Sequence, residues 1–468
     1  MHDHDTAETA AKWAEQEYGG AELGDRRRVQ RLVLMAAMAA IRPGGKVTEV
    51  FTEEAEREGA YRFLESESLA AVQLGKAAHR ATAQRSRGLP FVYVPTDQTD
   101  LRVVDRSDSK GLGSIGDGKT QARGLQVMNS IAVSPEGVPL GMCGQAYWAR
   151  RGNEGSKGKN DRRPWTEKET RYWIEAMEQT RTAFVEAAGG TRPWYQLDRG
   201  GDGWPMFLQA KFRDEWVTIR ATHDRRLQGL VTGEQGSVWG HMERQEPLGS
   251  YELRVPGGLK RKARQAVMQL QACPVTLDVQ LYPSTERMPM ALWAVRAVEV
   301  GTAPRGEEPI EWLLLTTYPV HGHKEAVEVL LGYSTRWRIE EFHKTWKSGA
   351  CRVEETQLQD GEAIERWATI LASVAMRIQR LMHLSRAQPD LPASTELTKH
   401  EIEAVIVLRR PRGVARTAKP TLAEAVRWIA DLGGYTGKSS GGPPGAIVLA
   451  RGLDYIRSAV HLLSVEKI

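Results

Sequence analysis

The chain has 468 residues, of which 41% are hydrophobic and 26% are charged, and its formal net charge is +5 at pH 7. This length and hydrophobic content exclude a disordered chain and predict roughly two or three domains with sizeable cores. Three cysteines that lie far apart exclude a disulfide framework, and the lack of any run of about 18 apolar residues excludes a membrane span. The excess of basic residues favours nucleic acid as a partner, although many basic proteins bind no polyanion.

Residues 1–70 are predicted to form a helical N-terminal domain. The segment RRRVQRLVLMAAMAAI carries apolar residues at helical spacing behind Arg26, Arg27 and Arg28. Arginines at the start of a helix can contact DNA phosphates, which makes these three candidate DNA ligands. An exposed basic face without a ligand explains the same pattern.

Residues 71–370 are predicted to form an α/β domain. LPFVYVPTDQTDLRVV has the pattern of a strand with a polar end, and QVMNSIAVSPEGVPLGMCGQAYWAR predicts a hairpin. A helix and another strand, RPWYQLD, follow. This order of elements predicts a mixed sheet flanked by helices.

A β-rich insertion is predicted within this domain, because residues from about 212 to 300 are strand-like throughout. Residues 371–468 alternate helices with polar linkers and predict a helical C-terminal domain. The insertion contains a basic cluster of candidate DNA contacts: Lys260, Arg261, Lys262 and Arg264.

The segment GSIGDGKT matches the phosphate-loop pattern of nucleotide-binding proteins and would place Lys119 on a phosphate. That loop needs a strand before it and a helix after it. Here the preceding strand ends well before the glycines, and LQVMNSIAV, which follows, has a strand pattern. A polar loop explains the glycines better, and we expect no nucleotide cofactor.

The stretch YSTRWRIEEFHKTWK, residues 333–347, predicts an amphipathic helix. On a helical wheel Tyr333, Arg336, Glu340 and Lys347 fall within about 60° of one another, opposite an apolar face. These residues form either exposed i,i+4 ion pairs or a cradle for a phosphate with one metal-binding carboxylate.

Two aspartates close predicted strands and are candidate partners of that carboxylate. Asp97 ends VYVPTD and Asp198 ends PWYQLD. Ligands collect at strand ends in α/β sheets, but an aspartate after a strand also often forms a turn or a helix cap. Both explanations remain open for each residue.

The spacing Tyr333-x2-Arg336-x3-Glu340-x6-Lys347 resembles the Y-R-E-K signature of the prokaryotic DDE transposases. The resemblance extends along most of the chain. LGDRRR and EGAYRF resemble the family's DNA-binding region, VPTDQT and LDRGGD its two aspartate strands, and EWLLLTTYPV the strand before the signature helix. Glycines follow the second aspartate where the family has bulkier residues, which would loosen that loop.

This resemblance implies a ribonuclease-H-like core and a catalytic triad of Asp97, Asp198 and Glu340 that holds two Mg²⁺ ions, with Mn²⁺ as a substitute. It implies that Tyr333, Arg336 and Lys347 grip a DNA phosphate and that Trp312 stacks with a base flipped from the duplex. Plain strand packing is the alternative for Trp312.

The function implied is cut-and-paste DNA transposition by phosphodiester hydrolysis, hairpin formation and strand transfer. The implied partners are the inverted repeats at the transposon ends, target DNA and a second copy of the chain in a synaptic complex. The C-terminal domain matches weakly, so its role in dimerisation is inferred from position. We expect a protein of the bacterial cytoplasm, associated with the nucleoid and without a signal peptide. An inactive DNA-binding inhibitor, a plain metal-dependent nuclease and a phosphate-loop ATPase are the alternatives.

Overall fold

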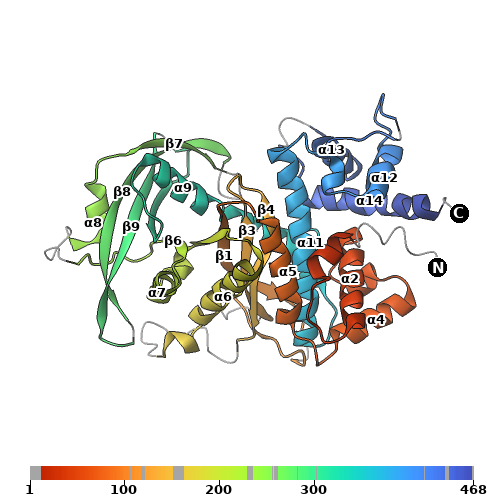
Figure 1. The fold of residues 1–468 in the computed structure, drawn as a ribbon, viewed down its shortest axis with the longest axis horizontal. Helices are drawn as coiled ribbons and strands as arrows, with labels where there is room; N and C mark the ends of the chain where they lie inside the picture. The colour runs from red at the N-terminus through yellow and green to blue at the C-terminus, as the bar shows by residue number, and fades with distance from the viewer. Residues whose placement is uncertain are drawn as a thin grey trace.

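The computed structural model describes residues 12–105, 108–116, 122–150, 163–228, 236–255, 257, 262–281, 283–301, 303–415, 417–437 and 442–465. The molecule is elongated, with a β-rich region at one end and helical regions at the other (Figure 1). Both termini lie at the helical end. Among the described residues, no helix combines the length and apolar character that a membrane span requires.

One mixed sheet of ten strands forms the centre of the described chain, in the order β2-β3-β1-β5-β6-β10-β9-β8-β7, with β4 paired to β3. The pairs β1–β5 and β5–β6 are parallel and the others are antiparallel. This architecture confirms the predicted α/β class, a mixed sheet flanked by helices. The strands are β1 (Phe91–Arg102), β2 (Gly113–Ser114), β3 (Arg123–Val133), β4 (Pro139–Trp148), β5 (Arg192–Leu197), β6 (Trp216–Arg220), β7 (Gly249–Val255), β8 (Arg264–Gln280), β9 (Arg287–Val300) and β10 (Glu311–Thr316).

The predicted insertion begins too early in the sequence. Residues 216–220, which we assigned to it, form β6 in the middle of the sheet, parallel to β5 and antiparallel to β10. The added strands are β7, β8 and β9, which extend the sheet beyond β10. The sequence pattern could not separate them, because a buried core strand and an insertion strand are both short apolar runs.

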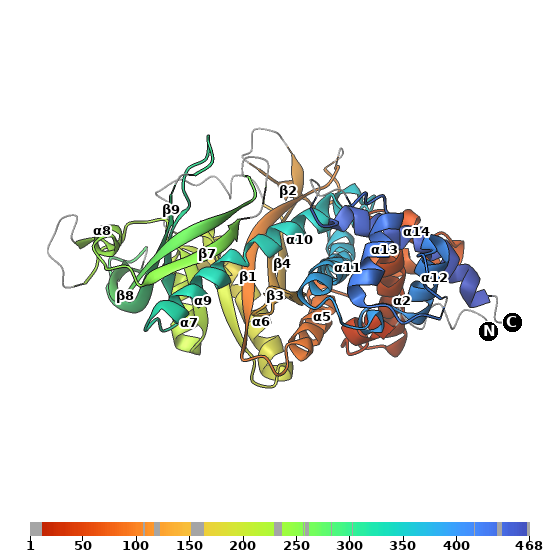
Figure 2. The same ribbon diagram turned by 90° about the horizontal axis from the view of Figure 1, so that it is seen from above.

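Helices cover both faces of the sheet and form the two ends of the chain (Figures 1 and 2). They are α2 (Arg26–Ile41), α3 (Val47–Val50), α4 (Glu54–Leu64), α5 (Ala71–Arg85), α6 (Thr170–Ala187), α7 (Trp204–Arg213), α8 (Val238–Glu243), α9 (His323–Ser334), α10 (Trp337–Lys347), α11 (Gly361–Ala387), α12 (Lys399–Arg409), α13 (Leu422–Leu432) and α14 (Ala446–Val465).

Helix α11 is the longest of these and is buried along most of its 27 residues. It packs against α2, α5, α10, α13 and α14, and against β4. The predicted domain boundary at residue 370 therefore falls inside one continuous helix, which serves the N-terminal, catalytic and C-terminal regions together. Trp367 illustrates the connection, because its indole nitrogen donates to the Gly45 carbonyl at 2.8 Å.

The predicted single helix over residues 333–347 is two helices, α9 and α10, which follow one another across the sheet (Figure 2). Ser334 and Thr335 cause the interruption. Their hydroxyls donate to the carbonyls of Leu331 and Gly332 at 2.7 and 2.6 Å. Side-chain bonds of this kind compete with the helical backbone pattern.

Close packing of α9 on the sheet requires glycine at position 332. A Cβ there would lie 2.6 Å from the Tyr93 ring. Gly332→Ala should therefore lower the free energy of unfolding by about 1–3 kcal/mol, measured by urea denaturation. The matched control is Gly75 in α5, where a Cβ would meet its nearest neighbour at an ordinary 3.4 Å. Gly75→Ala should raise stability by about 0.5–1 kcal/mol, and equal effects of the two changes would contradict the packing argument.

Candidate active site

Two neighbouring parallel strands bring the two predicted aspartates together. Thr96 pairs with Leu197 in the β1–β5 register, so Asp97 and Asp198 follow at the same level of adjacent strands. Adjacent strands lie about 4.8 Å apart, so the two carboxylates are neighbours. Asp198 contributes to a raised pKa of Asp97, which agrees with that proximity.

Arg336, between α9 and α10, joins Asp97 to the third predicted acid. Its guanidinium donates from Nη1 to Asp97 Oδ2 at 2.6 Å and from Nη2 to Glu340 Oε1 at 2.7 Å. The Asp97 side chain is 17% exposed and that of Glu340 is 56% exposed. The structure therefore joins Asp97 to Glu340 through Arg336 and places Asp198 beside Asp97.

Charge and burial oppose each other at this site. Burial raises the pKa of Asp97 to about 6, and Asp198 adds to the rise, whereas Arg336 and the Gln98 amide lower it. Burial lowers the pKa of Arg336, but Asp97, Tyr333 and Asp198 together raise it above its ordinary value. Arg336 therefore stays charged and partly compensates Asp97, whose charged form burial penalises.

In the part of the chain that the structure describes, no three acidic, histidine or cysteine side chains converge into a ready-made metal site. The donor set nevertheless fits a hard cation, because carboxylate oxygens are the ligands that Mg²⁺ and Mn²⁺ prefer. Arg336 supplies the positive charge between Asp97 and Glu340 in this structure. A divalent ion would take over that charge compensation.

The loop after Asp198 is closely packed rather than loosened by its glycines. The Gly200 amide donates to Asp198 Oδ1 at 2.7 Å, so Asp198 also caps the short helical turn that follows. A Cβ on Gly201 would lie 2.8 Å from Leu197 Cβ and 3.3 Å from the Trp173 ring. The Gly200 amide therefore holds the Asp198 carboxylate, and a bulkier residue would not fit at position 201.

Tyr333 lies at the end of α9 and is only 5% exposed. Its ring meets Trp312 edge to face, with centroids 4.9 Å apart. Burial raises the pKa of Tyr333, and a hydrogen bond with Arg220 is among the influences that lower it. The sequence analysis did not predict a role for Arg220. Its position as a cation at the end of a core strand is the feature that could have indicated one.

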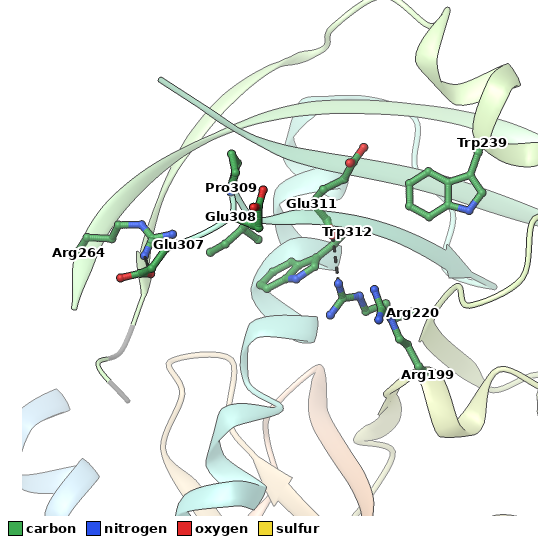
Figure 3. Close-up of a pocket in the computed structure, with 10 residues that line it drawn as sticks. Arg199, Arg220, Trp239, Arg264, Glu307, Glu308, Pro309, Glu311 and Trp312 are labelled. Carbon is green, nitrogen blue, oxygen red and sulfur yellow. Dashed lines mark hydrogen bonds and ion pairs between the residues drawn. The ribbon is translucent and has the colours of Figure 1, made fainter. Parts of the chain in front are cut away.

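A cavity of about 360 Å³ opens beside Trp312 (Figure 3). Two tryptophans from different regions line it, Trp312 of β10 and Trp239 of α8, together with Arg199 and Arg220. Trp312 itself is 6% exposed and also contacts Trp337, with centroids 6.1 Å apart. Trp312 therefore packs against neighbouring side chains and also forms part of the cavity wall.

Lys347 lies at the other end of α10. Its ammonium donates to Thr99 Oγ1 at 3.2 Å and lies 3.6 Å from Glu354 Oε1. Thr99 is two residues beyond Asp97 on β1, so Lys347 belongs to the same site.

The other predicted DNA contacts lie away from the acids. Arg26 and Arg27 are exposed at the start of α2, whereas Arg28 donates to Ser68 Oγ at 2.8 Å and to the Leu23 carbonyl. These residues are in the helical region at the opposite end of the molecule from β7–β9 (Figure 1).

Arg264 in the insertion is occupied by intramolecular ion pairs. Its guanidinium bonds both oxygens of Glu299 at 2.7 and 2.8 Å and Glu307 Oε2 at 2.7 Å. These bonds give Arg264 a structural role, and its contact with DNA stays a prediction. Lys262 is exposed, while Lys260 and Arg261 lie outside the described residues.

The described residues around the phosphate-loop pattern do not provide the helix that a phosphate loop needs after it. Gly113 and Ser114 form β2, and the next described element is the strand β3 rather than a helix. Lys119 lies outside the described residues.

The charge balance around Asp97 predicts how stability depends on pH in metal-free protein. Its pKa is about 6 in the folded chain against an ordinary 3.8, so the folded state binds more protons between these values. The free energy of unfolding should therefore fall as pH rises through this window, by at most about 1.4 kcal/mol per pH unit from this group. Asp97→Asn should be more stable than wild type at pH 7 and lose that advantage toward pH 4, measured by urea denaturation in EDTA. A variant less stable at pH 7 would contradict the assignment.

Comparison with known families matches the chain in three segments, the last two of which overlap slightly. Residues 10–69 match the model for "Transposase DNA-binding", residues 120–377 that for "Transposase DDE domain", and residues 373–464 that for "Transposase Tn5 dimerisation domain". Asp198 and Glu340 lie within the DDE match, and Asp97 precedes it.

The family matches establish the general properties of this chain. They indicate an enzyme that acts on DNA, uses divalent metal and forms a dimer. The DDE match alone spans more than half of the sequence. The chain therefore belongs to the family of DDE transposases, with a dimerisation region of the Tn5 type.

Proposed function

We propose that this transposase cuts and rejoins DNA at a site in which Asp97, Asp198 and Glu340 hold two Mg²⁺ ions, with Mn²⁺ as a substitute. The observation that carries the proposal is the Arg336 guanidinium, which bonds Asp97 and Glu340 beside Asp198. Asp97 lies beside Asp198 and shares Arg336 with Glu340, and its burial makes an uncompensated negative charge costly there. A cation is the partner that such a site requires.

When bound, the ions would activate a nucleophile and stabilise the leaving 3′ oxygen of a phosphodiester. The chain's own residues would do the rest. The three carboxylates would hold the ions, and Arg336, released from Asp97 and Glu340, would turn to a DNA phosphate together with Tyr333 and Lys347. Arginine suits this task because its guanidinium can bond two phosphate oxygens at once.

One site would serve four successive displacements. Water would first free a 3′-OH at the transposon end, and this hydroxyl would attack the opposite strand to give a hairpin. Water would open the hairpin, and the 3′-OH would then attack target DNA. Each step replaces one oxygen on phosphorus by another, so the same carboxylates and the same phosphate grip suffice.

The cavity beside Trp312 supports the hairpin step. Its aromatic walls, Trp312 and Trp239, suit a base turned out of the duplex, and Arg199 and Arg220 beside them suit a phosphate (Figure 3). The third arginine of the cavity, Arg264, is bonded to glutamates at its far side. Flipping a base costs a few kcal/mol, which stacking on an aromatic ring offsets.

DNA-end recognition would involve a separate part of the chain. Arg26 and Arg27 on α2 would contact phosphates of the inverted repeat, a kind of contact that weakens with salt. Two copies of the chain, joined through residues 371–468, would hold both transposon ends in a synaptic complex. Such a complex would assemble on the bacterial nucleoid.

Removing one triad carboxylate should separate cleavage from binding. Glu340→Gln should lower Mg²⁺-dependent nicking of transposon-end DNA by about 100-fold or more, while the Kd for that DNA in EDTA stays unchanged. Denaturing gels and a gel-shift assay measure the two quantities. Glu341→Gln is the matched control, because the Glu341 carboxylate bonds His383 of α11 at 3.0 Å.

The same variant tests the alternatives to transposition. Wild-type protein should join pre-cut ends to a plasmid, which a plain nuclease does not, and Glu340→Gln should not. Nicking that survives in Glu340→Gln would overturn the triad, and wild-type protein that binds ends without cutting them would support an inactive inhibitor.

Trp312 should matter for the hairpin more than for the first nick. Trp312→Ala should slow hairpin formation by at least about tenfold, because the extruded base loses its stacking partner, and leave the first nick within about threefold. Time courses on labelled ends measure both steps. Trp293→Ala, a tryptophan of β9 that lies against His321, is the control. Equal slowing of both steps would favour the packing role of Trp312.

A further inference from the structure

A row of polar side chains runs across three strands beside the acidic site. Asp97 of β1 pairs with Asn129 of β3, and Asn129 pairs with Gln145 of β4. Residues directly opposite each other in antiparallel strands point to the same face of the sheet. Asp97, Asn129 and Gln145 therefore form one row on one face.

Hydrogen bonds connect Gln145 and Asn129 of this row to the helix that carries Glu340. Gln145 Nε2 donates to Asn129 Oδ1 at 2.8 Å, and Asn129 Nδ2 lies 3.2 Å from His343 Nε2. Because the Asn129 carbonyl accepts from Gln145, its amide nitrogen is the donor and His343 Nε2 is the acceptor. His343 lies three residues after Glu340 on α10.

The three hydrogen-bonded residues are buried, with exposed fractions of 0% for Asn129, 6% for Gln145 and 9% for His343. Burial lowers the pKa of His343 to about 3, with smaller contributions from Lys347 and Arg336. The ring is therefore neutral and keeps its acceptor at Nε2. A buried hydrogen bond of this kind is costly to break, because both groups would lose their partner.

The His343–Asn129 bond differs from the other bonds that hold α10 to the sheet. Arg336 bonds Asp97 and Lys347 bonds Thr99, but both side chains are assigned to DNA in the proposed reaction. Arg338 donates to the Gly137 carbonyl, in the turn between β3 and β4, and to Glu341 on its own helix. The bond from His343 lies beside Asp97 and involves neither ion nor DNA.

We propose that His343 and Asn129 are positioning residues that hold Glu340 at a fixed distance from Asp97 after Arg336 has released both carboxylates. The ions would then meet a preformed pair of ligands rather than a mobile helix. This inference rests on the proposed assignment of Asp97, Asp198 and Glu340 as metal ligands. It adds a histidine that touches neither ion nor substrate.

Direct binding of Mn²⁺ in the absence of DNA tests the proposal, with free Mn²⁺ measured by electron paramagnetic resonance. His343→Leu is close in size but lacks the acceptor, and it should weaken Mn²⁺ binding by about tenfold or more, as loss of a group that orients a ligand does. His343→Gln keeps an acceptor within reach of Asn129 and should restore binding to within about threefold. The Kd for end DNA in EDTA should be the same in all three proteins.

A matched control separates positioning from general stability. Thr345→Val removes a different buried hydroxyl of α10, one that bonds Gln379 of α11 instead of the sheet. It should lower the Tm without changing the affinity for Mn²⁺. Wild-type affinity for Mn²⁺ in His343→Leu, or equal losses of affinity in His343→Leu and Thr345→Val, would overturn the proposal.

Two further comparisons keep the result interpretable. Glu340→Gln should lose Mn²⁺ binding; if it does not, the metal assignment fails, whatever His343 does. If His343→Leu does not fold, His343→Gln and His343→Asn decide, because asparagine is one methylene too short to reach Asn129. Weaker Mn²⁺ binding by His343→Asn supports the proposal, and equal binding overturns it.

Discussion

One guanidinium compensates two carboxylates at the centre of this protein. Burial alone would push Asp97 toward its neutral form, and Asp198 on the next strand adds to that tendency. Arg336 opposes both by bonding Asp97 and Glu340 together. In this structure the interaction also ties the start of α10 to β1, because Arg336 at the start of the helix bonds an acid of the sheet. The acids carry more negative charge than Arg336 neutralises, so they would attract metal cations. Arg336 itself would attract a phosphate.

The rest of the fold serves to keep α10 in that place. Gly332 lets α9 approach Tyr93 on the sheet, and on its other side α10 rests on α11, where the Trp346 indole donates to the Ala368 carbonyl at 2.9 Å. Tyr18 near the N-terminus bonds Ser373 of the same helix at 2.9 Å. The segments matched to DDE catalysis and to dimerisation overlap at residues 373–377, inside α11. One helix therefore links DNA binding, chemistry and dimerisation.

Local pattern predicted most elements of the fold and failed where local and tertiary preferences diverge. The hairpin β3–β4 and the helix α2 follow from alternation and helical spacing. The break before α10 does not, because it depends on hydroxyls of Ser334 and Thr335 that bond back to the preceding turn. The place of β6 was also missed, since an apolar run fits a core strand and an insertion equally well. Arg264 belongs to a basic cluster in the sequence, yet two distant glutamates take up its charge.

The sequence by itself determined the chemical types at the site: aspartates at two strand ends, a glutamate on an amphipathic helix, and bases at helical spacing around it. It also pointed to the family, because these residues follow one another along the chain in the order typical of the DDE transposases. Only the tertiary structure decided that the parallel register of β1 and β5 sets Asp97 beside Asp198, and that Arg336 joins Asp97 to Glu340. It alone disclosed Arg220, Trp239 and the His343–Asn129 bond. The physical reason is that charge compensation, burial and cavity walls depend on residues far apart in sequence. The periodicity of a sequence predicts only local structure, that is, helices and strands.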